Sequence, residues 1–231
     1  MDNNMQSLYA NRFDGELESK NAMWRVLCRH FFQKYVNAAK QDGSLRVADV
    51  AAGYCEWINN IEATEKYAVD MNPDTAKFAA DGVKSITGGI DALAAETGSG
   101  YFDCVFMSNF LEHLNSKEEV QTVVTQAWQM LRDGGRLMIL QPNIKYVGGK
   151  YWDFFDHKTP LTEQSLTELV DMIRAEGKGR EGKGTFVVKR FLPYTTKSAL
   201  PKSPWLIRLY LLLMPISGWI FGEQSFMIFE R

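Results

Sequence analysis

Short apolar runs alternate with helical segments between residues 45 and 141, and this alternation constrains the fold more than any other feature of the sequence. The segments between the runs have a helical pattern, and the longest reaches from about Ser116 to Leu131, where Asp133-Gly134-Gly135 ends it. The apolar runs are expected to form strands at residues 45–50, 66–70, 83–87, 102–108 and 136–141. Strands separated by helices predict a parallel sheet with right-handed crossovers and helices on both faces.

Further elements are expected on both sides of this core. Two more strands at residues 185–192 and 225–230 complete a seven-stranded, mostly parallel sheet of the α/β class. An apolar stripe at Trp24, Leu27, Phe31 and Tyr35 predicts a helix before the first strand. We therefore expect an N-terminal helical cap at 1–44 and one main domain at 45–231.

Composition argues against several classes of protein. The chain has 26 basic and 28 acidic residues, so it has no excess positive charge for a nucleic-acid partner. Its three cysteines and three histidines are scattered and form no CxxC pattern, so neither a metal site nor a disulfide framework is expected. Free thiols and an N-terminus without a signal-peptide pattern favour a cytoplasmic protein.

A hydrophobic helical insertion is expected between the last two strands, at about 195–222. Its apolar stretch, 205–221, is interrupted by Arg208, Pro215 and Gly218, whereas a transmembrane helix needs about 20 continuous apolar residues. A buried or interfacial helix fits better. Lys197 and Lys202 add positive charge nearby, so such a helix could lie on a membrane surface. The alternatives are a lid over the site or a helix that contacts the partner in a homodimer.

The turn after the first strand is a candidate ligand site, because open α/β sheets bind ligands at the carboxyl ends of their strands. The turn, Ala51 to Cys55, has one glycine and therefore lacks the GxGxxG fingerprint of dinucleotide-binding proteins. Asp70 ends the second strand, where a carboxylate can accept hydrogen bonds from both hydroxyls of a ribose. Together these features predict a ribose-containing ligand without a pyrophosphate group.

Four motifs, taken in order, resemble those of class I S-adenosylmethionine-dependent methyltransferases: VADVAAGYCEW, KYAVDMNP, YFDCVFMSNFLEHL and MLRDGGRLMILQPN. The resemblance covers roughly residues 45–143. It implies a Rossmann-like methyltransferase domain at 45–231 and S-adenosylmethionine as the cofactor. The chain departs from the family at Ala51 and Cys55, where glycine is usual.

The resemblance also implies which residues bind the cofactor. The carboxylate and ammonium of the methionine part would be held by Asp49, Ala51, Ala52 and Gly53, and the ribose by Asp70. Met71 would flank the adenine, and Ile90 and Asp91 would lie near its edge. The residues facing the methionine part and the methyl group would be Ser108, Asn109 and Phe110.

A hydroxyl or amine acceptor must lose a proton during or after methyl transfer, so a base is expected. His157 is the first candidate, because imidazole titrates near neutrality. Glu112 and His113 are further candidates, and the alternative for both is a supporting role in the loop after the fourth strand. Aromatic and acidic side chains that would contact the acceptor follow the fifth strand, unless this segment is an ordinary buried loop: Tyr151, Trp152, Asp153 and Phe155.

The sequence thus predicts an S-adenosylmethionine-dependent methyltransferase that acts on a small-molecule, sugar or lipid-linked acceptor. Nucleic-acid acceptors are disfavoured, because the chain has neither a Pro-Pro-aromatic motif after the fourth strand nor a Pro-Cys dipeptide. Two alternatives stay open. The departures at Ala51 and Cys55 suit a catalytically inert cofactor-binding module, and Asp70 also suits an NAD-dependent oxidoreductase.

Overall fold

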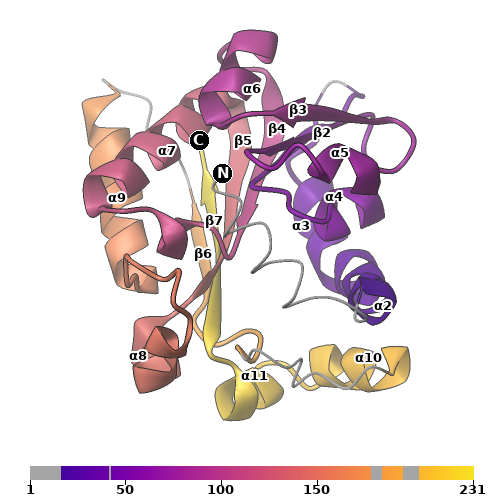
Figure 1. Cartoon of the computed structure of the whole chain (residues 1–231), viewed down its shortest axis with the longest axis vertical. Coiled ribbons are helices and arrows are strands. Elements are labelled where there is room, and N and C mark those ends of the chain that lie inside the picture. The colour runs from indigo at the N-terminus through magenta and orange to yellow at the C-terminus, as the bar shows by residue number, and fades with distance from the viewer. Residues whose placement is uncertain (1–16, 42, 178–183, 195–202) are drawn as a thin grey trace.

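The computed structural model describes residues 17–41, 43–177, 184–194 and 203–231. Its centre is a seven-stranded sheet in the order β3-β2-β1-β4-β5-β7-β6 (Figure 1). The strands are β1 (Arg46–Val50), β2 (Glu65–Asp70), β3 (Val83–Thr87), β4 (Phe102–Ser108), β5 (Leu131–Pro142), β6 (Thr185–Val188) and β7 (Gln224–Glu230). The first five pair in parallel, and β7 runs antiparallel to both β5 and β6. The predicted α/β fold with a mostly parallel, seven-stranded sheet is confirmed.

Helices cover both faces of this sheet (Figure 1). One face carries α2 (Leu17–Leu27), the π-helical turn η1 (Cys28–Phe32), α3 (Gln33–Asn37), α4 (Glu56–Asn60), α5 (Thr75–Phe78) and α10 (Pro204–Leu212). The other carries α6 (Ile90–Thr97), α7 (Lys117–Met130) and α9 (Glu163–Glu176). Shorter elements are η2 (Leu111–His113), α8 (Ile144–Val147), η3 (Gly148–Asp153) and α11 (Ile216–Phe221).

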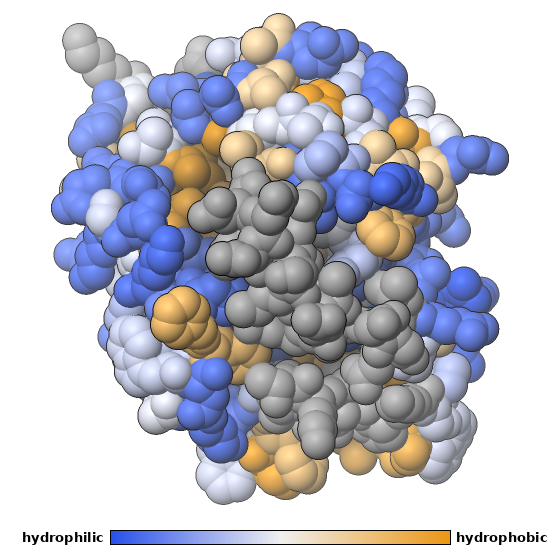
Figure 2. Space-filling view, in the orientation of Figure 1, coloured by the Kyte–Doolittle hydropathy of each residue, from blue (hydrophilic) through white to orange (hydrophobic). Residues whose placement is uncertain are grey.

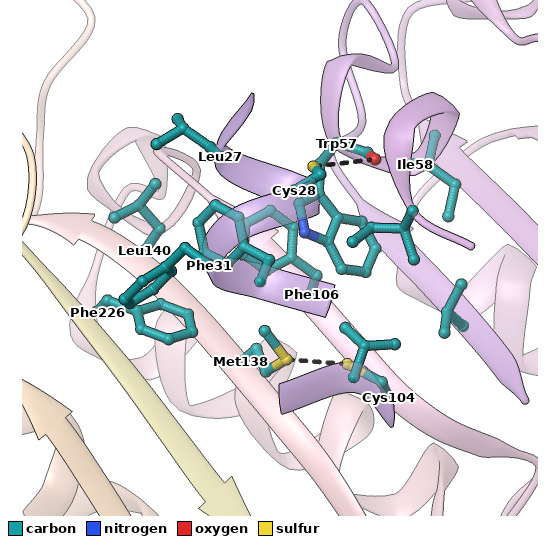
Figure 3. Packing of buried hydrophobic residues seen from close by; sticks show 14 of the residues in the cluster. Leu27, Cys28, Phe31, Trp57, Ile58, Cys104, Phe106, Met138, Leu140 and Phe226 are labelled. Atoms are coloured by element: carbon teal, nitrogen blue, oxygen red, sulfur yellow. Dashed lines mark hydrogen bonds between the residues drawn. The ribbon is translucent and has the colours of Figure 1, made fainter. Parts of the chain in front are cut away.

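Two hydrophobic clusters, one on each face, hold these layers together. Successive side chains of β4 point to opposite faces of the sheet, so this strand contributes to both clusters. Cys104 and Phe106 belong to the cluster on the α2 side, and Val105 and Met107 to the cluster on the α7 side. Figure 3 shows the first cluster, in which Trp57 stacks on Phe106 with ring centroids 4.3 Å apart. The sheet is therefore buried on both faces, as its near-continuous apolar strands predict.

The three cysteines belong to the same side of the molecule and are free and buried. Cys104 lies 3.2 Å from the sulfur of Met138, and the Cys28 thiol faces the carbonyl of Trp57 (Figure 3). Burial raises the pKa of Cys55 to about 12 and raises the pKa values of Cys28 and Cys104 as well. These thiols stay protonated at neutral pH and act as small core side chains.

Two strand boundaries differ from the prediction. β5 begins at Leu131 instead of 136, because Asp133-Gly134-Gly135 forms an irregularity within the strand and not a turn before it. A Cβ on Gly135 would lie 2.9 Å from the carbonyl oxygen of Arg132, so only glycine allows this close approach. β6 ends at Val188, before the expected Leu192, and the chain then turns beneath α11.

The predicted hydrophobic insertion is two helices in its described part, α10 and α11, separated at Pro215. Residues 195–202 of the insertion and residues 1–16 of the predicted cap lie outside the described residues. Within the part that the structure describes, no helix is long and apolar enough to cross a membrane. The division into a cap and a main domain stays a prediction.

One edge of the sheet gathers the segments that matter for function. The turn after β1, η2 after β4 and α8 after β5 all leave the carboxyl ends of parallel strands. Because β7 is antiparallel, its first residue, Gln224, pairs with Pro142 at the end of β5. The helix that precedes β7, α11, therefore lies at the same edge (Figure 1).

Candidate functional site

The register of the central strands brings the predicted cofactor-binding residues together. Val50, the last residue of β1, pairs with Val69 of β2 on one side and with Met107 of β4 on the other. The turn that begins at Ala51 therefore lies between Asp70 and Ser108, the last residues of those strands. The sheet thus places three segments of the expected site side by side.

The turn after β1 has an unusual backbone. Ala51, Gly53 and Cys55 adopt φ values of 60°, 52° and 59°, in the left-handed region that favours glycine. Ala51 and Ala52 both donate their backbone N–H groups to the carbonyl of Val69, at 2.9 and 3.2 Å. Ala51 and Cys55 therefore keep the backbone conformation for which glycine is the usual residue.

Asp70 is buried and fixed by backbone donors. Its Oδ2 accepts a hydrogen bond from the N–H of Gly53, and its Oδ1 accepts one from the N–H of Asn72, both at 2.8 Å. A carboxylate can accept about four hydrogen bonds. The Asp70 carboxylate is therefore held in one orientation and can still accept two more hydrogen bonds. Met71, the next residue, is exposed beside it.

Three carboxyl groups surround the turn. Burial raises the pKa of Asp49 well above its ordinary value, and the nearby charges of Glu56 and Asp70 raise it further. The N–H of Ile58 donates to Asp49 and opposes this shift. Burial also raises the pKa of Glu56, against the attraction of Lys20. Because these carboxyl groups repel one another, a cation at the turn would be strongly favoured.

The remaining residues that were predicted to bind the cofactor flank the turn. Gly88, after β3, donates its N–H to the carbonyl of Asp70, which brings the start of α6 to the site with Ile90 buried and Asp91 exposed. Asn109, after β4, has a φ of 48° and donates through its side chain to Ser108. Phe110 packs partly buried against the α7 cluster.

The three predicted catalytic candidates lie in one cluster at η2, in which Glu112 and His157 are buried and His113 is half-buried. The Nε2 atom of His113 lies 4.0 Å from the carboxylate of Glu112, and its Nδ1 atom lies 3.3 Å from that of Asp156. The Nε2 atom of His157 is 2.8 Å from the hydroxyl of Tyr194. Each of Glu112, His113 and His157 offers an atom within 4.8 Å of the others, which is longer than a hydrogen bond and is the spacing of side chains that could share a metal ion.

Burial sets the electrostatics of this cluster. Glu112 is fully buried, which raises the pKa of its carboxyl group, while His113 and the side chain of Gln141 oppose the shift. The His157 ring is almost parallel to that of Phe154, at 4.7 Å, and is therefore held in one orientation. The backbone carbonyl of Glu112 also accepts hydrogen bonds from Lys158 and Thr159, which docks the loop of His157 onto η2.

The aromatic segment after β5 alternates between interior and surface. Tyr151 is fully buried, and its hydroxyl donates to the carbonyl of Thr159 at 2.7 Å. Trp152 and Asp153 are exposed, and Phe155 is 92% exposed. Half of the segment therefore packs as a buried loop would, and the other half presents side chains to solvent.

Four site residues were not assigned from the sequence: Glu56, Phe154, Asp156 and Tyr194. The first three stand next to assigned residues or within the motifs that carry the family resemblance, and this closeness in sequence could have indicated them. Tyr194 carries no such signal, because it reaches His157 from a segment 37 residues away, beyond β6.

Comparison with known proteins gives both a family and a fold. Residues 48–139 match the family described as a methyltransferase domain. No curated protein matches the sequence. Among solved structures, the chain resembles an S-adenosylmethionine-dependent methyltransferase from Archaeoglobus fulgidus, with 18% identity, 98% of this chain and 99% of that chain covered, and a TM-score of 0.63.

Two further structures share the fold. One is the plantazolicin methyltransferase BpumL, solved with a monoazolic desmethylPZN analog and S-adenosylhomocysteine; the identity is 10%, 99% of this chain and 90% of that chain are covered, and the TM-score is 0.63. The other is an S-adenosylmethionine-dependent methyltransferase from Mesorhizobium loti, with 14% identity, 86% and 96% coverage, and a TM-score of 0.55.

Proposed function

Residues 48–139 belong to the class I S-adenosylmethionine-dependent methyltransferases, and from this premise we propose that the chain methylates a small-molecule, sugar or lipid-linked acceptor at the carboxyl edge of its sheet. When bound, S-adenosylmethionine supplies a sulfonium-activated methyl group, so the protein has to bind, orient and desolvate the two reactants. The single observation that carries the proposal is the cluster of Glu112, His113 and His157 at the same edge of the sheet as the turn after β1.

The turn after β1 fits this cofactor chemically. Asp49, Glu56 and Asp70 surround the turn with acidic groups, and the cofactor carries positive charge on its sulfur and its ammonium group. We assign the methionine part to Asp49 and the Ala51–Gly53 turn. Asp70, already oriented by the N–H groups of Gly53 and Asn72, is assigned to the ribose hydroxyls.

The adenine and methyl ends of the cofactor would lie along the neighbouring segments. We assign Met71, Ile90 and Asp91 to the adenine. Ser108, Asn109 and Phe110 are assigned to the methionine part and the methyl group. This assignment is supported by the pairing of Met107, the residue before Ser108, with Val50, the residue before the turn.

His157 is the proposed base that removes the acceptor proton. Tyr194 orients its ring through the 2.8 Å hydrogen bond, and Phe154 holds the ring plane. Glu112 and His113, each with an atom within 4.8 Å of His157, are the alternative bases. Asp156 holds His113 in place.

The acceptor itself would rest on the exposed part of the segment after β5. Trp152 and Phe155 present aromatic surface for flat or apolar acceptors, and Asp153 presents a carboxylate for hydroxyl groups. Tyr151 supports this segment from the interior. A small acceptor is consistent with the structurally similar plantazolicin methyltransferase, which was solved with a desmethylPZN analog.

The experiment is a measurement of S-adenosylhomocysteine formation with a panel of phenols, sugars, amines and lipid-linked alcohols. With the best acceptor, His157→Gln should lower turnover by roughly 10²–10⁴-fold, the range for loss of a general base, and should leave S-adenosylmethionine affinity unchanged. Tyr194→Phe keeps the ring and removes its hydroxyl, so we expect a smaller loss and a shifted pH–rate profile.

The matched control is His30→Gln, which changes an exposed histidine outside the cluster and should keep full turnover on a water-soluble acceptor. Full turnover in His157→Gln would refute the assigned base. Cofactor binding without product from any acceptor would instead favour the inert module, and binding of NAD alone would favour the oxidoreductase.

A further inference from the structure

Helices α10 and α11 expose an unusual amount of apolar surface. Eight large apolar side chains on these helices and on the turn between them are 37–79% exposed, and we call this group the apolar face: Trp205, Leu206, Leu212, Leu213, Ile216, Trp219, Ile220 and Phe221. Figure 2 shows hydrophobic side chains along its lower edge, where Figure 1 places these helices. Contiguous exposed patches of this kind mark binding surfaces.

The polarity of α11 is inverted relative to an ordinary surface helix. Its small residues Ser217 and Gly218 are buried, while its large apolar residues point to solvent. A Cβ on Gly218 would collide with the carbonyl oxygen of Arg190, so the helix backbone lies directly on that segment. Ser217 donates to the carbonyl of Tyr210 at 2.6 Å and fixes the rotation of the helix. The fold therefore holds the apolar side outward.

Helix α10 is anchored in a similar way. Ile207 and Tyr210 are buried, and the Tyr210 hydroxyl donates to the carbonyl of Phe191. The exposed Arg208 lies between these anchors in sequence and donates through its Nε atom to His30 at 2.9 Å. Both helices thus present apolar side chains from fixed positions.

The described charges on and beside the apolar face are mainly positive. Arg208 lies on α10, Lys189 and Arg190 lie in the segment before it, and the acidic Glu223 after α11 is paired with Lys150. A groove of about 680 Å³ beside the face is lined in part by His30, Lys34, Lys189 and Arg190, with aromatic and aliphatic side chains between them. None of the described residues that line it is acidic. The occupant of this surface should therefore be apolar and anionic.

We propose that the apolar face docks the protein onto the surface of an anionic phospholipid bilayer. Tryptophans such as Trp205 and Trp219 are favoured where apolar and aqueous phases meet, and basic residues are attracted to anionic headgroups. A second copy of the chain is a poorer occupant, because two such faces would bring like charges together. The contact is interfacial, because α10 and α11 are 9 and 6 residues long and each is held against the protein by buried residues.

Docking would bring the carboxyl edge of the sheet close to the bilayer, because α11 leads directly into β7 at that edge. This placement suits the lipid-linked class of acceptor, and that one consequence rests on the proposed function. The docking itself does not depend on methyl transfer.

The test is flotation of the full-length chain with vesicles of phosphatidylcholine alone or mixed equally with phosphatidylglycerol. We expect binding to the anionic vesicles at low salt, weakening as salt is added, and little binding to phosphatidylcholine. Replacing Trp219 and Phe221 together by serine should weaken binding at least about tenfold, from the loss of buried apolar area. Arg208→Ala should weaken it about fivefold, the effect of one cation near an anionic surface.

Matched controls change the same kinds of residue elsewhere. Met172→Ser removes an exposed apolar side chain from α9, and Lys117→Ala removes an exposed cation from α7; both should bind as the parent does. Absence of flotation, or equal flotation of the serine variant, overturns the proposal. So does a dimer in solution that the same serine substitutions dissociate, which would assign the face to a second copy. Because flotation needs no acceptor or turnover, these outcomes are independent of the catalytic tests.

Discussion

At the scale of single residues, the turn after β1 shows that backbone conformation and side-chain identity can be separated. Ala51 and Cys55 stand where glycine is usual in the family, and both adopt φ near 60°. An L-residue in the left-handed region costs roughly 1–2 kcal/mol. The chain retains the turn at that cost, so these substitutions are no argument against cofactor binding.

Ala51→Gly should therefore stabilise the protein. Relief of the left-handed strain outweighs the greater freedom of glycine in the unfolded chain, for a net gain of about 0.5–1 kcal/mol in the free energy of unfolding. Urea unfolding would show a higher midpoint with an unchanged slope. The same change in a helix, Ala94→Gly in α6, should instead cost about 1 kcal/mol. A loss of stability in Ala51→Gly would contradict the strained turn.

The residues of the candidate site were predictable where they follow strands. Asp70 and Ser108 end apolar runs, so their meeting at one edge follows from the topology of a parallel sheet. The contact between Tyr194 and His157 was not predictable, because it depends on where an irregular segment after β6 comes to rest. The alternation of Tyr151 and Trp152 between interior and surface likewise depends on the 3₁₀ turns of η3.

At the scale of elements, the order and type of the strands and longer helices followed from the alternation of apolar runs. The errors concern two strand boundaries. Asp133-Gly134-Gly135 is typical of a turn, yet in β5 it is a strand irregularity that allows close backbone contact. β6 ends at Val188 instead of Leu192, and the backbone after it lies directly against α11. In both cases tertiary packing decided where the strand begins or ends.

Gly218 fixes the position of α11, and a substitution there gives a specific prediction. Because an added methyl group would collide with the carbonyl of Arg190, Gly218→Ala should displace α11 and cost about 1–3 kcal/mol, as overpacking does. Urea unfolding gives the change in stability, and limited proteolysis reports whether 203–222 becomes easier to cut. Gly149→Ala, at a glycine with open space around it, should change stability by less than about 0.5 kcal/mol. Equal stability of both variants would contradict the direct backbone contact of α11.

At the scale of the whole molecule, two surfaces of opposite charge share one edge of the sheet. The turn after β1 is surrounded by Asp49, Glu56 and Asp70, whereas Arg208 lies on α10 and Lys189 lines the groove beside the apolar face. A cationic cofactor and an anionic bilayer would each meet the complementary charge. The composition does not reveal this arrangement, because the numbers of acidic and basic residues in the whole chain are nearly equal.

The acidic turn should distinguish the positively charged S-adenosylmethionine from its neutral-sulfur product, S-adenosylhomocysteine. Burial raises the pKa of Asp49 in the folded chain, so its contribution to stability is fully present below its unfolded pKa and is lost as pH rises through the folded value. A bound cation favours the ionised carboxylate and opposes that loss. Binding of S-adenosylmethionine relative to S-adenosylhomocysteine should therefore strengthen as pH rises through the same range.

Thermal unfolding with each ligand measures this difference. A ligand at 100 times its Kd stabilises the fold by about 2.7 kcal/mol, which for a chain of this size raises Tm by roughly 5–10 °C. We expect the advantage of S-adenosylmethionine over S-adenosylhomocysteine to grow with pH in the parent protein. In Asp49→Asn, which cannot ionise, that advantage should be smaller and independent of pH. Glu96→Gln, at an exposed carboxylate on α6, should behave as the parent does. An undiminished, pH-dependent advantage in Asp49→Asn would show that the buried carboxylate beneath the turn does not sense the charge of the cofactor.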